Sequence, residues 1–148
     1  MTAAFRPPRF VFLVNRAQRA MMRWIEGRPQ AWEGASAAQA ALLFLLAGRD
    51  AASVGEIAAA LEVAPAAVTN LSKRMQAAGL VERVADEHDA RLTRLRLTGA
   101  GMAAGAQAKL VLAQLNASLC QGFTPEELQT VARWLDHAAL SLKAQDDT

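Results

Sequence analysis

The sequence is poor in the residues on which disulfide-bonded, metal-binding and catalytic proteins depend. Its 148 residues include one cysteine, Cys120, so an intramolecular disulfide is excluded and a reducing compartment is favoured. The two histidines, His88 and His137, lie in different predicted elements, and there is no H-E-x-x-H motif, cysteine pair or glycine-rich phosphate loop. These absences predict a protein that is not an enzyme and that holds no metal or cofactor.

Long apolar runs are missing as well. The stretch FVFLV (10–14) is followed directly by Asn15 and Arg16, and AALLFLLAG (40–48) is far shorter than the about 20 apolar residues of a membrane-spanning helix. No targeting signal is recognisable. We therefore expect a cytoplasmic protein that has no membrane partner.

An excess of one charge is also missing. The chain carries 16 basic and 14 acidic residues, a net charge of +2, whereas nucleic-acid-binding domains usually show a basic stripe. Apolar residues are abundant, at 53% of the chain, with much alanine and few β-branched residues, which predicts a globular and mainly helical domain. A role in binding nucleic acid must therefore rest on local geometry and not on overall charge.

Helix signals surround a central segment, residues 53–101. Apolar residues three and four positions apart predict a helix over 10–26. A second helix starts at Ser36, and because its body is apolar on nearly all sides we expect it at the centre of the core. Two more helices follow the central segment, with Thr98 and Thr124 as their N-caps.

The central segment itself predicts two short helices, a turn and a β-hairpin. Ser53 and Glu56 form a capping box at the start of the first helix. Pro65 fits the first turn of the second helix, although Ala64 before it is a poor N-cap. Two strands then flank the polar tip ADEHDA (85–90). A helix-turn-helix followed by such a wing is a surface shaped for duplex DNA.

The second short helix is the candidate recognition helix. Small or polar side chains face outward from it: Ala66, Thr69, Asn70, Lys73 and Arg74. Ala66 can meet a thymine methyl, Asn70 can pair with an adenine edge, and Lys73 can reach a guanine or a phosphate. The alternative interpretation is an ordinary solvated helix face, which the same side chains would also suit.

The hairpin tip is the candidate wing. Arg91 lies beside the tip, where an arginine can enter the minor groove, and Asp89 is placed to hold it extended. Arg94 and Arg96 share the exposed face of the second strand, and we include Arg94 among the predicted DNA contacts. The acidic residues nearby leave a second interpretation open, a charged turn that merely keeps the hairpin soluble.

Over essentially its full length the chain resembles the MarR family of transcriptional regulators. The resemblance rests on three motifs in this order: GLVER (79–83), DAR (89–91) and LTGAG (97–101). It implies a mainly α fold with a small β-hairpin wing in one domain (1–148). Within it, dimerisation helices (10–35 and 99–148) flank a winged helix-turn-helix lobe (36–98). The implied partners are a second copy of the chain and a palindromic operator in double-stranded DNA.

The resemblance also implies base contacts from Thr69, Asn70 and Lys73 and a minor-groove contact from Arg91. The chain departs from the family pattern at two of its positions. Ala90 replaces the first of two adjacent wing arginines, and Asn70 stands where arginine is frequent. Both departures predict a changed operator or a weaker hold on phosphate.

Family members bind small aromatic or phenolic effectors between the dimer helices and the winged lobe. The candidates for such a pocket are Arg16, Met21, Trp24, Trp32 and Phe44. The plainer interpretation is that Met and aromatic residues at helical spacing belong to the core. Thiol sensors of the family carry a cysteine near the N-terminus, whereas Cys120 lies late in a long helix and is predicted to be an inert core thiol.

The sequence thus predicts a dimeric, sequence-specific DNA-binding regulator, a repressor that a small-molecule effector releases. The alternative from another class is a winged-helix module for protein–protein contact with weak or no specific DNA binding. The near-neutral charge of residues 49–98 and Ala90 favour that alternative. The two differ in how steeply DNA binding should fall as the salt concentration rises.

Overall fold

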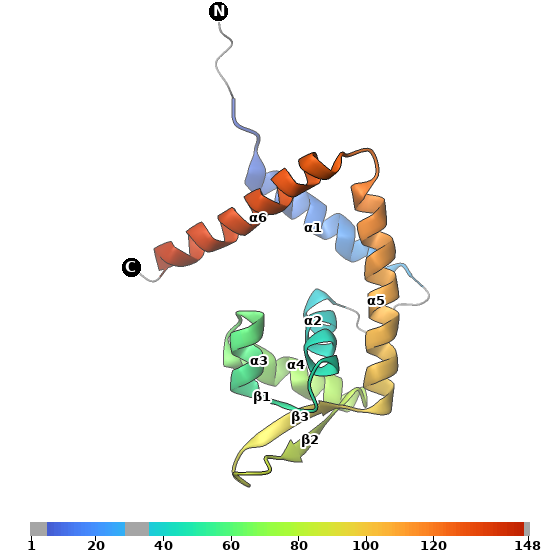
Figure 1. Ribbon diagram of the computed structural model, residues 1–148, viewed down its shortest axis with the longest axis vertical. Coiled ribbons are helices and arrows are strands. Elements are labelled where there is room, and N and C mark those ends of the chain that lie inside the picture. Colours follow the sequence, from blue (N-terminus) through green and yellow to red (C-terminus); the bar gives the residue numbers. More distant parts are fainter. Residues whose placement is uncertain (1–5, 29–35, 147–148) are drawn as a thin grey trace, which may run out of the picture. The chain divides into compact units, whose positions relative to one another are not determined.

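The computed structural model describes residues 6–28 and 36–146. The chain divides into two compact units, residues 1–113 and 114–148, so the boundary lies inside a helix. In chain order the described elements are α1 (Phe10–Glu26), α2 (Ala37–Ala47), β1 (Ala52–Ser53), α3 (Val54–Leu61), α4 (Pro65–Ala77), β2 (Val81–Ala85), β3 (Thr93–Leu97), α5 (Gly99–Cys120) and α6 (Pro125–Asp146) (Figure 1). The predicted fold class, mainly α with a small hairpin wing, is confirmed.

The three strands form one antiparallel sheet in the order β1–β3–β2. β2 and β3 pair along their lengths, and both lie within about one residue of the strands expected from the alternating pattern, 80–84 and 92–97. β1 joins the other edge of β3 and places Ser53 opposite Arg94. No prediction covered β1, because a two-residue strand carries no alternating pattern that could reveal it.

Helix α2 lies at the centre of the core of the first unit, as its all-apolar body predicts. Leu42 and Leu43 are fully buried, and Leu46 is 2% exposed. The helix-turn-helix and the sheet contribute the rest of this core: Ile57, Ala58, Val68, Leu71, Met75, Val81 and Leu95. Full burial of each large aliphatic side chain favours folding by about 1.5–3 kcal/mol. The core therefore holds α4 and the hairpin in fixed positions relative to α2.

The helix-turn-helix has the start signals that the sequence indicates. The Ser53 hydroxyl accepts from Glu56 N at 3.2 Å, and the Glu56 carboxylate accepts from Ser53 N at 2.8 Å, which completes the capping box. α4 begins with Pro65, and Ala64 provides no side-chain cap. Between the two helices Glu62 takes a left-handed conformation, with φ +54°, which costs a non-glycine residue about 1 kcal/mol.

The long helices bury less apolar surface than their patterns suggest. In α1, Ile25 is buried, but the apolar residues at the start of the helix are exposed, Val14 at 42%. In α5, Ala108 and Leu115 are buried, whereas Leu119, four residues beyond Leu115 on the same face, is 49% exposed. Among the described helices none is by itself long and apolar enough to span a membrane; α3 and α4 meet that test when joined across their 111° bend.

Helix α6 begins as the sequence predicts and also leaves its apolar face open. The Glu127 carboxylate accepts from Thr124 N at 2.9 Å, and the Thr124 hydroxyl accepts from Glu127 N at 3.3 Å, so this capping box is complete. Val131 and Leu135, four residues apart on one apolar face of α6, are 52% and 47% exposed. In a single chain the apolar face of α6 is therefore exposed to solvent.

Candidate nucleic-acid interface

Helix α4 presents the predicted recognition face to solvent. Ala66, Asn70, Lys73 and Arg74 are exposed, while Met75 on the opposite side is fully buried. Side chains three and four residues apart share a helix face, so Ala66, Asn70 and Lys73 line one surface. Within the described residues neither Lys73 nor Arg74 forms an ion pair. Both cationic groups therefore remain available to an anionic partner.

Thr69 is less available than its neighbours on this face. Its side chain is half-buried, and its hydroxyl donates to the carbonyl of Pro65 at 3.1 Å. A threonine hydroxyl has a single hydrogen to donate. In this conformation Thr69 can therefore only accept from a base, such as the amino group of adenine or cytosine.

The hairpin is fastened to the start of α5 by backbone contacts that explain the LTGAG motif. Thr98 N donates to the Leu80 carbonyl at 3.1 Å. The Thr98 hydroxyl donates to the Gly79 carbonyl at 2.6 Å and accepts from Gly101 N at 3.0 Å, so Thr98 is the predicted cap. At Gly101 a Cβ atom would lie 1.9 Å from the Leu80 carbonyl oxygen. This close approach therefore requires glycine.

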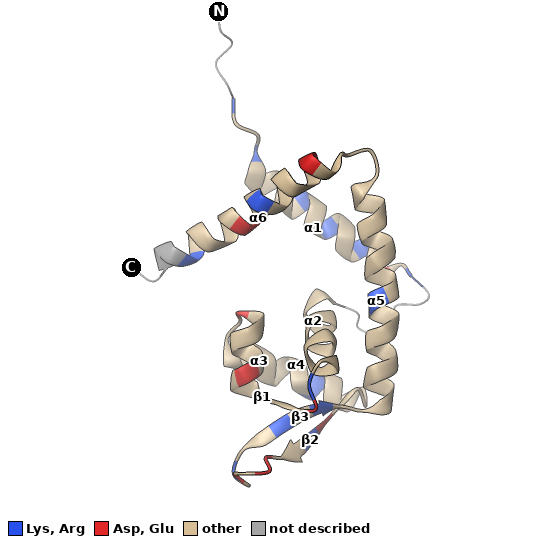
Figure 2. Cartoon of the chain, viewed as in Figure 1, with Lys and Arg blue, Asp and Glu red and all other residues tan. Residues whose placement is uncertain are grey.

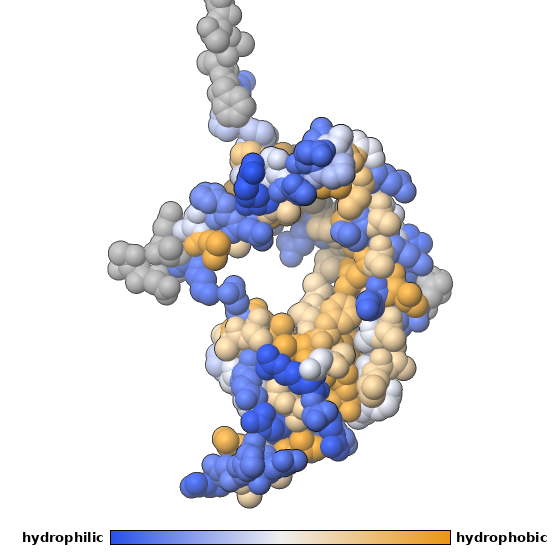
Figure 3. All heavy atoms as spheres, viewed as in Figure 1, coloured by the Kyte–Doolittle hydropathy of each residue, from blue (hydrophilic) through white to orange (hydrophobic). Residues whose placement is uncertain are grey.

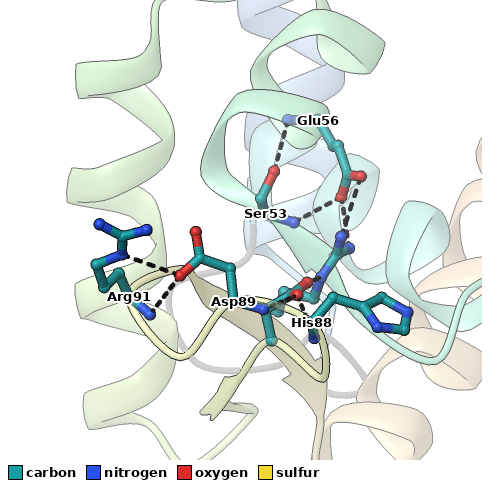
Figure 4. A network of polar contacts seen from close by, with 7 residues as sticks. Ser53, Glu56, His88, Asp89 and Arg91 are labelled. Atoms are coloured by element: carbon teal, nitrogen blue, oxygen red, sulfur yellow. Dashed lines mark hydrogen bonds and ion pairs between the residues drawn. The ribbon is translucent and has the colours of Figure 1, made fainter.

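The wing tip holds Arg91 as the sequence suggests. The Arg91 side chain is 92% exposed, and its Nε donates to the Asp89 carboxylate at 3.2 Å. The same carboxylate oxygen accepts from Arg91 N at 3.0 Å, so Asp89 fixes both the backbone and the side chain of Arg91 (Figure 4). The terminal nitrogens of the guanidinium stay exposed beyond this contact.

Arg94 lies in a different environment from the one predicted. The alternation of β3 suggests an exposed side chain, but the Arg94 side chain is 30% exposed and bridges two carboxylates. Its Nη1 donates to Glu56 at 2.8 Å, and its Nε donates to Asp86, which is 8% exposed. The guanidinium is thus occupied within the protein. The sequence could not show this, because Glu56 and Arg94 are 38 residues apart.

Arg96 is also paired within the hairpin. Its guanidinium contacts the Glu82 carboxylate on β2 at 2.7 Å. Arg91, Arg94 and Arg96 are thus each paired with a carboxylate. Figure 2 shows blue on β3 and red at the wing tip. The hairpin end of the lobe is nevertheless covered mainly by hydrophilic residues (Figure 3). The ion pairs of these three arginines help to hold the hairpin in shape.

Three of these groups have shifted pKa values. The hydrogen bond from Arg94, followed by those from His88 N and Asp89 N, lowers the pKa of Asp86 from 3.8 to about 2. The pKa of Glu56 is lowered, first by its bond from Ser53 N and then by Arg94. The pKa of Arg94 is raised, chiefly by Asp86. The stabilisation from Asp86 is therefore complete above pH 3.8 and is lost as the pH falls through about 2.

The candidate effector residues lie in several environments. Met21 and Trp24 are half-buried, and Trp24 lies under the Arg28 guanidinium at 3.7 Å from the ring centre. Phe44 is 39% exposed, and Arg16 is exposed above the Phe12 ring. Trp32 lies outside the described residues.

Two open cavities in the first unit are formed by other residues. One, of about 440 Å³, is lined by Leu46, Ala47, Gly48, Arg49, Asp50, Arg96, Leu97 and Met102. The other, of about 370 Å³, is lined by Asp50, Ala51, Val84, Ala85, Asp86, Glu87, His88, Arg94 and Arg96. In the part of the chain that the structure describes, no three His, Cys, Asp or Glu side chains gather to hold a metal ion. Cys120, which the sequence predicts to be an inert core thiol, is a free cysteine and is half-buried.

Comparison with solved structures identifies the same fold in ligand-responsive and DNA-binding proteins. PcaV from Streptomyces coelicolor, solved with its natural ligand, matches with a TM-score of 0.79 at 19% identity over 94% of this chain and 97% of that one. BpsR from Bordetella bronchiseptica, whose DNA binding is regulated by 6-hydroxynicotinic acid, matches with a TM-score of 0.75 at 22% identity over 94% and 98%. A mutant MarR from E. coli, complexed with operator DNA, matches with a TM-score of 0.73 at 24% identity over 88% and 91%.

Sequence comparison agrees with the shared fold. A search of curated proteins gives no match, but residues 33–92 match the model of the MarR family. That range holds α2, α3, α4, β2 and the wing tip with Arg91. Over this range the chain is therefore similar to the MarR family, and it shares the winged helix-turn-helix fold of the solved structures.

Proposed function

We propose that this regulator binds a palindromic operator as a homodimer and represses transcription until a small-molecule effector releases it. One observation carries the proposal: an exposed polar face of α4 and a 92% exposed arginine at the wing tip are held by the same buried core. A helix of this kind fits the major groove, and an arginine at a wing tip fits the adjacent minor groove.

The proposed contacts divide by role. Ala66, Thr69, Asn70 and Lys73 face base edges in the major groove, and Asn70 is suited to a bidentate contact with adenine. Arg74, at the border of this face, is assigned to phosphate, and Arg91 to the minor groove. Arg94 belongs to this set only if its two carboxylate partners release it, so we assign it no DNA contact.

The homodimer is supported by apolar surface that the single chain leaves exposed. Val14 at the start of α1 and Leu135 on α6 are each more than 40% exposed, and both lie on apolar helix faces. A two-fold interface between identical chains would bury such faces. A dimer would also present two copies of α4, which is what a palindromic operator requires.

An aromatic acid is the proposed class of effector. BpsR responds to 6-hydroxynicotinic acid, and PcaV was solved with its natural ligand, so the fold accommodates small ligands in related proteins. In this chain Arg16 is the proposed partner of the carboxylate, and the apolar candidates are Met21, Trp24, Trp32 and Phe44. Isothermal titration with hydroxylated aromatic acids, in the presence and absence of operator, tests this assignment.

The experiment that tests DNA binding is a fluorescence-anisotropy titration against inverted repeats upstream of the gene. We expect the affinity to fall steeply as salt rises, because each neutralised phosphate releases a counterion. A flat response would instead favour a winged-helix module that binds proteins.

The same titration with Asn70→Ala tests the recognition helix. We expect the preference to relax at one position of each half-site, by about 1–3 kcal/mol of discrimination. Asn116→Ala, the same change at an exposed position of α5, serves as the control and should leave operator preference intact. An equal loss of affinity on every sequence would identify Asn70 as a phosphate contact.

A further inference from the structure

A continuous series of polar contacts leads from the first helix of the helix-turn-helix to the wing tip. Figure 4 shows it from Ser53 and Glu56 at the start of α3 to Asp89 and Arg91 at the tip. The Glu56 carboxylate oxygen that accepts from Ser53 N at 2.8 Å also accepts from Arg94 Nη1 at 2.8 Å. The cap of α3 and the wing therefore share one oxygen atom.

The next link lies inside the wing loop. Arg94 Nε donates to one oxygen of Asp86, and the other oxygen accepts from His88 N at 2.8 Å and from Asp89 N at 2.9 Å. The Asp89 side chain in turn holds Arg91. The low pKa of Asp86, about 2, agrees with a carboxylate that all three donors hold ionised.

We propose that Arg94 is a positioning residue of the wing: it ties the wing loop to the start of α3 and so sets where Arg91 meets the DNA. The effect on DNA contact rests on the proposed function, whereas the link between Arg94 and the wing loop rests on the contacts described above. Without Arg94 the hairpin would keep its paired strands but lose the side chain that links Asp86 to Glu56. Arg91 would then sample positions from which it no longer reaches the minor groove.

The first test needs no DNA. In Arg94→Gln we expect amide hydrogen exchange at His88 and Asp89 to become faster by about tenfold, which corresponds to one net hydrogen bond. Glu56→Gln should produce a smaller change at the same two amides, because the glutamine oxygen still closes the capping box. Exchange unchanged at both amides in both variants would overturn the proposal.

Arg96→Gln is the matched control for this measurement. Arg96 lies on the same strand and also pairs with a carboxylate, but its partner Glu82 is across the hairpin and has no contact with the loop amides. We expect exchange at His88 and Asp89 to stay at the wild-type rate in this variant. A change equal to that in Arg94→Gln would overturn the specific role of Arg94.

The second test is a double-mutant cycle in operator binding. Arg91→Ala should weaken binding of the wild type but have almost no further effect in Arg94→Gln, because Arg91 is already misplaced there. The salt dependence of binding should also be the same in both single variants and in the double variant. If Arg94 instead contacts a phosphate, the losses add and the double variant has the shallowest salt dependence.

The two tests separate this inference from the proposed function. If the wild-type protein binds no DNA, the proposed function is wrong, but the exchange measurement still tests whether Arg94 holds the loop. If the wild type binds its operator and the cycle is additive, the function stands and the positioning role is overturned.

Discussion

At the scale of single residues, Gly101 sets the junction between the hairpin and α5. Its missing side chain lets the Leu80 carbonyl approach the first turn of α5, where a Cβ would lie 1.9 Å from the oxygen. The contact is to backbone, which cannot rotate away as a side chain can. The bonds of Thr98 to Gly79 and Leu80 depend on the same approach.

We therefore expect Gly101→Ala to lower the free energy of unfolding by about 1–3 kcal/mol, the usual cost of overpacking. Urea denaturation followed by circular dichroism measures the change. Gly99→Ala is the matched control, because a Cβ there meets nothing within 4 Å. Equal stability of the two variants would contradict the assigned role of Gly101.

Residue contacts could be predicted from the sequence when they are local. The hold of Asp89 on Arg91, two residues apart, was predicted, and the capping boxes at Ser53 and Thr124 are confirmed. The bridge from Arg94 to Glu56 could not be predicted, because it depends on β1 bringing the start of α3 beside β3. A pairing across 38 residues leaves no pattern in one sequence.

At the scale of elements, α4 combines the predicted DNA contacts with the weakest start among the helices of the winged lobe. α2 and α3 each have a serine cap, whereas Ala64 leaves the first N–H groups of α4 without a side-chain acceptor. Its backbone, at φ −65° and ψ 142°, already has the extended geometry of an N-cap. The deficiency is therefore confined to the side chain.

Ala64→Ser should raise the free energy of unfolding by about 0.5–1 kcal/mol, because the hydroxyl can accept from an N–H of the first turn. Thermal denaturation checks this, and Ala67→Ser, inside the same helix and exposed, should give no gain. An unchanged midpoint in Ala64→Ser would mean that water already satisfies the start of α4.

Helices could be predicted from the sequence where a capping residue marks their first turn. Serine and threonine caps marked the starts of α2, α3, α5 and α6. β1 was missed, although it supplies the edge that brings Ser53 to β3. Short strands depend on their partners and not on their own pattern, so the sequence had no means of revealing it.

At the scale of the whole molecule, exposed apolar residues on the terminal helices favour assembly. Val131 and Leu135 share the apolar face of α6, and Leu142 further along the helix is 63% exposed. Soluble monomers rarely leave contiguous apolar surface of this kind uncovered. The proposed two-fold interface gives these residues a partner.

Leu135→Glu should therefore convert the proposed dimer to a monomer. It should also strongly weaken the proposed operator binding, because one α4 then contacts one half-site at a time. Light scattering coupled to size-exclusion chromatography measures the mass, and anisotropy the affinity. Gln129→Glu adds the same charge at an exposed polar position of α6 and should leave the dimer intact. A Leu135→Glu protein that remains dimeric would remove α6 from the interface.

The exposed face of α4 has a consequence for how this protein can acquire new operators. Ala66, Asn70 and Lys73 are exposed, while Val68, Leu71 and Met75 on the same helix form the core. Exchanges at exposed positions usually change stability by less than about 0.5 kcal/mol. Under the proposed DNA contacts, operator preference and folding depend on separate residues of one helix. A library randomised at these three positions should therefore yield folded variants with altered targets.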